Sequence, residues 1–279
     1  LQSVPLAIVA VSYSVAVFPT LAQIFKRKEI DVFLDKMGTA LRHIIFWSMP
    51  AMVFFIVLRA QIVRVVLGAR QFSWSDTRIT AAALALFIIS IVAQGFVLIF
   101  VRAYYAGGRT MKPLIINGST SLLTIVFAFV LVKLFDLWPF FRFFWISILR
   151  VDDVSVAKVL MLPLAYSLNN LINAWLLWLY FEKDFGRLPG LVRRAGFECF
   201  SAAVISGFFV YETLDLVGRV LSLNSFWGVF LQGFLSGLVG IVVLVAILKS
   251  MGNRELSEVY TSLHGRIWRQ QRIITDENV

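Results

Sequence analysis

Residues 79–101 read ITAAALALFIISIVAQGFVLIFV, a stretch of 23 residues without a single charged side chain. A helix of about 20 apolar residues crosses the hydrocarbon core of a bilayer, so this stretch predicts a transmembrane span. The whole chain shares this character, because 59% of its 279 residues are hydrophobic and only 15% are charged. Soluble domains carry about 25% charged residues. The chain is therefore predicted to be an integral membrane protein.

Further apolar stretches lie on both sides of this span. They cover residues 4–18, 42–58, 114–132, 159–181, 195–216 and 220–248. A transmembrane β-barrel would instead need alternating segments of about 10 residues, and the sequence shows none. The prediction is an all-α integral membrane protein with about seven transmembrane helices.

Two other stretches have an amphipathic pattern, which predicts helices lying on the membrane surface. The first is 20–41, with apolar residues at helical spacing at Ile30, Phe33, Leu34 and Met37. The second is the tail, 249–279, with an apolar stripe at Leu256, Val259, Tyr260, Leu263 and Ile267. Residues 133–158 are instead rich in Trp and Phe, and are expected to form an interfacial loop.

Positive charges are unevenly distributed between the loops. Of the 26 lysines and arginines, 17 lie in one alternating set of loops, formed by residues 20–43, 102–112, 182–194 and 249–279. Positively charged loops stay in the cytoplasm, so the C-terminus is predicted to be cytoplasmic and the N-terminus external. An external start at Leu1 without a signal peptide leads us to expect a preceding segment. The net charge of +10 fits this topology, and nucleic acid is not expected as a partner.

Residues that carry catalysis or bind metals are sparse. Cys199 is the only cysteine, and the two histidines, His43 and His264, lie far apart in the sequence. This set matches no metal-ligand or catalytic spacing, so no metal site, cofactor or enzymatic activity is predicted. Glu198 and Glu212 lie near the ends of one span, where an interfacial position is expected rather than a proton relay.

Amide side chains interrupt several of the spans. They are Gln94, Asn117, Asn169, Asn170, Asn173 and Gln232. Such residues usually form hydrogen bonds between membrane helices. Asn169 and Asn173 are four residues apart and share one helix face, so they are the best candidates for lining a polar cavity.

The turn that follows residues 79–101 is predicted to carry a cationic cluster. Arg102, Arg109 and Lys112 lie close together there, beside Tyr104 and Tyr105. Cations of this kind can bind the phosphate or pyrophosphate of a lipid headgroup. The headgroup candidates are therefore Arg102, Arg109, Lys112 and Tyr105. The alternative interpretation is that these cations only fix the topology.

Four short motifs follow one another along the first part of the chain. They are LQSVP at 1–5 with AVFPTLA at 16–22, Pro50, VLGARQF at 66–72 with Asp76, and RAYYA at 102–106 with Arg109, Thr110 and Pro113. Together they resemble the MurJ/MviN family of lipid II flippases, within the multidrug/oligosaccharidyl-lipid/polysaccharide exporter superfamily. The resemblance covers residues 1–132 by motif and the remainder by the order of the spans. It implies the eighth to fourteenth helices of a two-lobed fold of about fourteen helices.

The resemblance also implies an organisation and a function. Residues 1–181 would form the C-terminal lobe without its first helix, 182–248 two additional helices that line a groove for a lipid tail, and 249–279 a cytoplasmic amphipathic tail. The implied function is flipping of lipid II across the bacterial inner membrane, without a cofactor. Implied partners are lipid II or another polyprenyl-pyrophosphate-linked glycan, the bilayer and an N-terminal lobe outside this chain. The alternatives are export of another polyprenyl-linked glycan and a non-transporting membrane scaffold.

Overall fold

The computed structural model describes residues 1–68, 73–149, 154–221 and 225–261, and every regular element in these ranges is helical. The first helix continues through α1 (Ser3–Leu6), a π-helical turn (Ala7–Val11) and α2 (Ser12–Lys26). The others are α3 (Ile30–Val57), α4 (Arg59–Leu67), α5 (Trp74–Ile88), α6 (Ile91–Ala106), α7 (Met111–Leu137), α8 (Pro139–Leu149), α9 (Val154–Val159), α10 (Met161–Phe185), α11 (Leu191–Gly218) and α12 (Phe226–Ser250). Residues 254–261 form one more helical segment.

The predicted fold class is confirmed. Within the described ranges, six helices are long and apolar enough to cross a membrane. They are Ser3–Lys26, Ile30–Val57, Met111–Leu137, Ala157–Phe185, Leu191–Gly218 and Phe226–Ser250. Helices α5 and α6 make a seventh when they are taken as one span bent by 41°.

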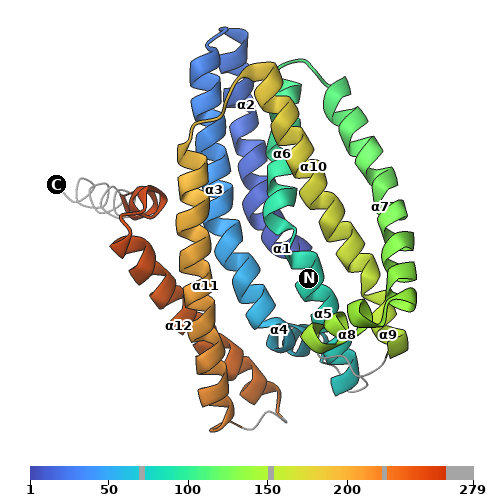
Figure 1. Ribbon diagram of the computed structural model, residues 1–279. Helices are drawn as coiled ribbons and strands as arrows, with labels where there is room; N and C mark the ends of the chain where they lie inside the picture. The colour runs from blue at the N-terminus through green and yellow to red at the C-terminus, as the bar shows by residue number, and fades with distance from the viewer. Residues whose placement is uncertain (69–72, 150–153, 222–224, 262–279) are drawn as a thin grey trace, which may run out of the picture.

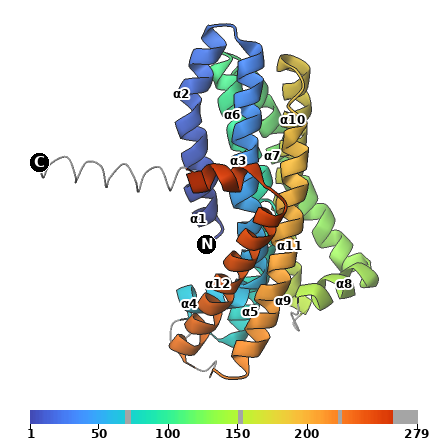
Figure 2. The ribbon, with the colours of Figure 1, turned by 90° about the vertical axis from the view of Figure 1, so that its left-hand side faces the viewer.

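The long helices form one elongated bundle (Figure 1). Helices α2, α3, α6 and α10 lie at its centre, with α7 on one side and the hairpin of α11 and α12 on the other. The α2–α3 turn, the α6–α7 turn and the C-terminal end of α10 share one end, which we call the basic end. Helices α4 and α8 and the α11–α12 connection lie at the other, which we call the opposite end (Figure 2).

The core is divided between these two ends. Near the basic end, aromatic side chains from three helices pack together, including Phe33, Phe100, Tyr104 and Phe181, all fully buried. The rings of Phe181 and Phe185 have centroids 4.9 Å apart. A second cluster joins α5, α7, α8, α9 and α10 through residues such as Leu86, Phe135, Leu149 and Met161. Apolar burial at both ends fixes how the spans are arranged.

The predicted surface helix over residues 20–41 is wrong. Residues 20–26 complete α2, Lys28 takes a φ of 63° beyond the end of this helix, and α3 begins at Ile30. The apolar stripe is helical as predicted, but Phe33 and Met37 are fully buried inside the bundle. The ring of Phe33 packs against Phe25 and Phe185, with centroids 5.5 and 5.6 Å away. Protein therefore covers the stripe at Phe33 and Met37, whereas Ile30 at its start stays exposed.

The predicted aromatic loop over 133–158 is also wrong in its first half. Helix α7 continues to Leu137, and Pro139 then begins α8, in keeping with the preference of proline for the first turn of a helix. Phe140, Phe143 and Phe144 on α8 remain exposed, as an interfacial position requires. The aromatic residues therefore belong to a short helix at the opposite end.

Helices α11 and α12 pack closely because glycines face large neighbours. A Cβ atom added to Gly240 would lie 2.3 Å from Cγ2 of Val210 and 3.1 Å from Cζ of Phe54. A Cβ atom added to Gly207 would lie 2.5 Å from Cγ1 of Val53. Small residues let membrane helices approach in this way. The hairpin of α11 and α12 is thereby seated against α3.

Candidate functional site

Asp184 organises the polar contacts of the basic end. Its carboxylate pairs with Lys112 and accepts a hydrogen bond from the hydroxyl of Tyr104 at 3.0 Å. Nη1 of Arg109 lies 3.5 Å from Oδ1 of Asp184, and the guanidinium of Arg109 lies 5.2 Å from the centroid of the Phe185 ring. Only 10% of the Asp184 side chain is exposed, whereas 48% and 45% of Arg109 and Lys112 are. The two cations thus stay accessible to a second anion.

The α6–α7 turn has the tight geometry that its glycines predict. Gly108 takes a φ of 68°, and the N–H of Arg109 donates to the carbonyl of Tyr104 at 2.9 Å. This bond satisfies a carbonyl at the C-terminal end of α6 and brings Arg109 back toward α10. The backbone of this turn therefore determines where Arg109 lies.

The four headgroup candidates do not form a single cluster. Arg109 and Lys112 meet at Asp184, as described above. Arg102 points toward the first helix, where its guanidinium lies 5.7 Å from the ring centroid of Phe18. Tyr105 is 45% exposed, whereas its neighbour Tyr104 is buried. The sequence pattern predicted that these residues cluster, but it did not reveal Asp184, the acidic partner of Arg109 and Lys112.

The amide side chains within the spans fall into two groups. Gln232 donates to the carbonyl of Leu214 at 2.8 Å and accepts from Gln61 at 3.2 Å, so its predicted role between helices is confirmed. Asn169 and Asn173 are only 7% and 8% exposed, and their Oδ1 atoms accept no hydrogen bond from any described residue. Buried polar atoms usually have hydrogen-bond partners, so a hydrogen-bond donor placed next to these two oxygens would be favourable.

The bend between α5 and α6 forms a polar site that the sequence pattern did not reveal. The hydroxyl of Ser167 on α10 donates to the carbonyl of Leu86 at 2.6 Å, where α5 is about to end. Gln94 donates to the hydroxyl of Ser90 at 2.8 Å and faces the hydroxyl of Tyr166 at 3.4 Å. Broken membrane helices are tolerated where neighbouring side chains satisfy the freed backbone groups. Here Ser167 of α10 provides the hydrogen bond to a backbone carbonyl at the bend.

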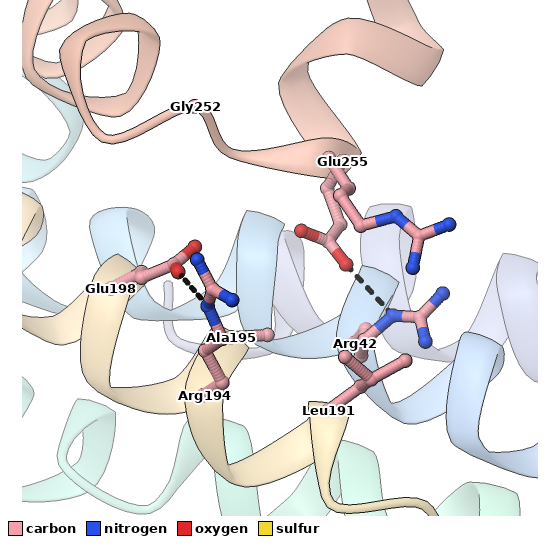
Figure 3. Close-up of a pocket in the computed structure, with 8 residues that line it drawn as sticks. Arg42, Leu191, Arg194, Ala195, Glu198, Gly252 and Glu255 are labelled. Atoms are coloured by element: carbon pink, nitrogen blue, oxygen red, sulfur yellow. Dashed lines mark hydrogen bonds and ion pairs between the residues drawn. The ribbon is translucent and has the colours of Figure 1, made fainter.

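The structure also has two hollows, the larger of which is lined in part by Gln61 and Gln232. A cleft of about 740 Å³ at the opposite end lies between α3, α4, α5, α8, α11 and α12, and its polar wall includes Arg59, Arg78, Arg219, Asp215 and Gln61. A smaller pocket of about 180 Å³ lies where the C-terminal segment meets α3 and α11, with Arg42, Arg194, Glu198 and Glu255 in its wall (Figure 3). The spacing of these residues along the sequence predicted neither hollow.

A sequence model of the family described as "Lipid II flippase MurJ" matches residues 1–227 of this chain. The chain belongs to the MurJ family. The match takes in every described element from α1 to α11 and ends within the first turn of α12. The rest of α12 and the helical residues 254–261 lie beyond it.

Two known MurJ proteins are similar to this chain. "Probable lipid II flippase MurJ" of Rickettsia prowazekii (strain Madrid E) is 29% identical over 126 residues, which are 43% of this chain and 25% of that protein. The solved structure of "Lipid II flippase MurJ, inward closed conformation" matches with a TM-score of 0.66 at 23% identity. The match covers 91% of this chain and 45% of the solved one, so the fold is shared along nearly the whole chain. The chain spans less than half the length of both MurJ proteins.

Membership of the MurJ family agrees with the motif resemblance over 1–132. Of the motifs, RAYYA contributes Tyr104 to the contacts of Asp184, and AVFPTLA contributes Phe18 to the contact with Arg102. Much of the VLGARQF motif lies outside the described residues. Asp184, the hub of the basic end, belongs to no motif. Its position in the last turn of an apolar span, at the same end as the cations, was the one available signal.

Proposed function

We propose that this chain is the C-terminal half of a lipid II flippase. With an N-terminal lobe it would move the lipid-linked peptidoglycan precursor from the inner to the outer leaflet of the bacterial inner membrane. The observation that carries this proposal is that the MurJ family match over residues 1–227 coincides with a MurJ fold over 91% of the chain. MurJ flippases are transporters, so this chain would contribute to binding of the lipid and to the conformational change that moves it.

The proposed orientation places the basic end in the cytoplasm. The α2–α3 turn, the α6–α7 turn and the α10–α11 connection all lie at this end, and their loops are rich in lysine and arginine (Figure 1). Loops of this kind are retained on the cytoplasmic side. The C-terminus would then be cytoplasmic, and the cleft beside Arg59, Arg78 and Arg219 would lie toward the outer leaflet.

We further propose that the basic end receives the headgroup through exchange at Asp184. The carboxylate of Asp184 pairs with Lys112 and lies 3.5 Å from Arg109. A pyrophosphate carries more negative charge and accepts several hydrogen bonds, so it competes for the same two cations. Arg102 and Tyr105 would contact the outer part of the headgroup, and Asn169 and Asn173 remain the proposed cavity-lining residues.

We also propose a division of the chain into three parts. Residues 1–181 would form the lobe, 182–248 the two additional helices and 249–279 the tail. Helices α11 and α12 expose a broad apolar surface that includes Phe197, Phe208, Phe234 and Val242. Such a surface suits the long isoprenoid tail of a lipid-linked precursor. Alternating access would come from rocking of this lobe against its N-terminal counterpart.

A hybrid flippase tests this proposal. The C-terminal half of a full-length MurJ relative is replaced by this chain, and the hybrid is expressed in cells depleted of their own flippase. Restored growth is expected. The control is the first half of the relative expressed alone, which should not restore growth. Co-purification of the two halves after cleavage of their connecting loop reports assembly. A hybrid that assembles in the membrane and still leaves lipid II on the inner leaflet contradicts the proposal.

A further inference from the structure

The segment after α12 turns back across the bundle. Gly252 takes a φ of 65°, which turns the chain sharply after Ser250, and residues 254–261 then form a helix. In Figure 2 this helix lies across α2 and α3, at an angle to α12. Asn253 begins it, because its Oδ1 atom accepts a hydrogen bond from the N–H of Leu256 at 3.1 Å. This is the usual role of an N-cap asparagine.

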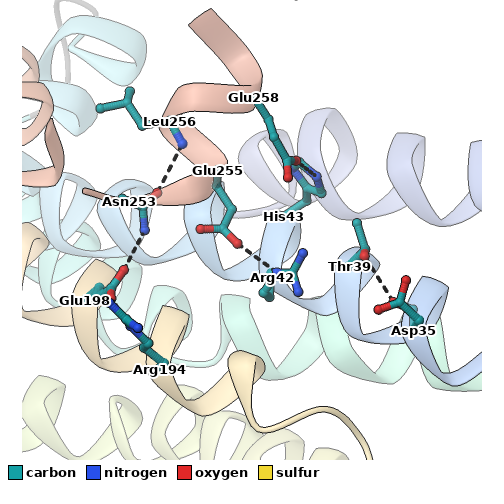
Figure 4. A network of polar contacts seen from close by, with 10 residues as sticks. All are labelled: Asp35, Thr39, Arg42, His43, Arg194, Glu198, Asn253, Glu255, Leu256 and Glu258. Atoms are coloured by element: carbon teal, nitrogen blue, oxygen red, sulfur yellow. Dashed lines mark hydrogen bonds and ion pairs between the residues drawn. The ribbon is translucent and has the colours of Figure 1, made fainter. Parts of the chain in front are cut away.

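The same asparagine ties the segment to α11 (Figure 4). Its Nδ2 atom donates to Oε2 of Glu198 at 3.0 Å, and Oε1 of Glu198 accepts from Nε of Arg194 at 2.7 Å. Asn253 is only 3% exposed. One buried amide therefore both caps the short helix and joins it to the first turns of α11.

Two carboxylates of the segment pair with two consecutive residues of α3. Oε1 of Glu255 lies 2.8 Å from Nε of Arg42, and the two side chains are 4% and 8% exposed. Oε2 of Glu258 lies 3.2 Å from Nε2 of His43, whose ring packs 5.4 Å from that of Tyr13 on α2. Glu255 and Glu258 are three residues apart and so lie on one helix face, directed at α3.

Apolar contacts support the same face. Leu256 and Val259 pack against the core cluster of the basic end, together with Leu244 and Ile247 from the last turns of α12. On the side toward α11, however, a pocket of about 180 Å³ remains between the segment, Leu191, Ala195 and Arg194 (Figure 3). The segment is held by a few polar contacts and one apolar face, and does not fill the space beside α11.

We propose that residues 253–261 form a strap that locks the C-terminal end of α12 against α3 and the start of α11, and that opening of the Arg42–Glu255 pair releases it. The strap links the C-terminal end of α12 to Arg42 of α3 and to Glu198 near the start of α11. Gly252 supplies the hinge, since its φ of 65° is unfavourable for a residue with a Cβ atom. This inference holds whether or not the chain flips lipid, and the strap lies outside the region that the MurJ family model matches.

The buried pair is suited to a two-state contact. A buried charge that loses its partner is strongly unfavourable, so the strap is either fully docked or fully released. The pocket beside Arg194 and Ala195 leaves room for Glu255 to withdraw without disturbing close apolar packing. The interaction thus defines one docked register of the strap and opposes intermediate positions.

Hydrogen–deuterium exchange of the whole chain in lipid nanodiscs tests the strap. In Glu255→Gln, the amides of residues 254–261 and of the last turn of α12 are expected to exchange at least about tenfold faster than in the unmodified chain, since an uncompensated buried charge remains on Arg42. The charge-swapped variant Arg42→Glu with Glu255→Arg is expected to restore slow exchange to near the original rates. Ser257→Ala, an exposed position on the same helix, is the matched control and should leave all rates unchanged.

Several outcomes of the exchange measurement would overturn the proposal. Unchanged exchange in Glu255→Gln would show that the pair does not hold the strap. Faster exchange confined to 254–261, with the end of α12 unaffected, would reduce the segment to a surface helix. A uniform increase that includes α6 and α10 would show that the pair supports the whole fold instead, and failure of the charge swap to restore exchange would point to the same conclusion.

Discussion

Nε of Arg42 lies 2.8 Å from Oε1 of Glu255. The Nε–H bond is not directed at this oxygen or at any other described acceptor, so the contact is an ion pair without a hydrogen bond. Both side chains are almost completely buried. The pair joins α3 to a segment at the far end of the sequence. It is the most deeply buried of the ion pairs found between described residues.

Replacing one member of this pair should be far more harmful than replacing both. Arg42→Met leaves Glu255 without a counter-charge in the docked strap and should lower the free energy of docking the strap by about 3–5 kcal/mol. Arg42→Met combined with Glu255→Leu should lose much less, because an apolar pair of similar volume needs no charge compensation. Hydrogen–deuterium exchange of residues 254–261 and of the last turn of α12 measures both. Additive losses in the double variant would show that the two side chains do not interact.

The contact of α12 with α11 predicts a position-specific effect of methyl groups. Gly240→Ala would place a Cβ atom 2.3 Å from Val210, so overpacking should cost about 1–3 kcal/mol. Gly118 on α7 is the control, because its Cβ position has no neighbour within 4 Å. Gly118→Ala should stabilise the chain by about 0.5–1 kcal/mol through helix propensity alone. Equal effects at the two sites, measured by denaturant titration, would contradict the close packing described for α12.

The bend between α5 and α6 predicts a role for Ser167. Ser167→Ala removes the 2.6 Å hydrogen bond to the carbonyl of Leu86 and leaves that buried carbonyl unsatisfied. The expected cost is about 1–3 kcal/mol, measured by thermal unfolding in detergent. Ser121→Ala is a suitable comparison, since Ser121 is exposed and bonds only within its own helix. If both variants unfold at the same temperature, α10 does not hold the bend.

Asp184 should hold the α6–α7 turn in place. Asp184→Asn removes the charge that Lys112 and Arg109 share, and faster amide exchange is expected at residues 107–110. The two cations are about half exposed, so the loss of stability should be only about 1 kcal/mol and should shrink at high salt. Asp35→Asn, an exposed position at the same end, provides the reference. A loss of stability that does not change with salt would argue against the ionic contacts.

The headgroup candidates make a separate prediction for the hybrid flippase. Arg102→Gln, Arg109→Gln and Lys112→Gln together should reduce lipid II transport about tenfold or more, since each hydrogen bond to a charged group contributes about 1.5–3 kcal/mol. Membrane insertion, checked by the accessibility of tags on both sides, serves as the control for topology. Unchanged transport with correct insertion would leave these residues with a purely topological role.

The sequence predicted the spans well because each apolar stretch approaches or exceeds the length that a bilayer requires. The uncharged residues 79–101 are largely helical and apolar, as a span requires, but their bend was not predictable, since its hydrogen-bonding partner, Ser167, lies in another helix. The stripe of Phe33 and Met37 was correctly helical and wrongly assigned to the membrane surface. Periodicity shows that one helix face is apolar and does not show whether lipid or protein covers it.

The candidate site was only partly predictable for the same reason. The cations Arg109 and Lys112 were found because they are adjacent to a span end, but Asp184 was not, since its contact with them depends on how α10 packs beside α6 and α7. The Arg42–Glu255 pair was likewise not predictable, because it depends on how residues 253–261 fold back onto α3. Contacts between distant segments follow from packing and are absent from local patterns.

The most direct test of the proposed function is a measurement of which leaflet holds lipid II. Cells depleted of their own flippase and carrying the hybrid with this chain are treated with an enzyme that cleaves lipid II only from outside. If the chain is the C-terminal half of a lipid II flippase, the hybrid should make lipid II cleavable to the level seen with the full-length relative. Lipid II that stays protected, while the hybrid is assembled at normal abundance, would contradict that function.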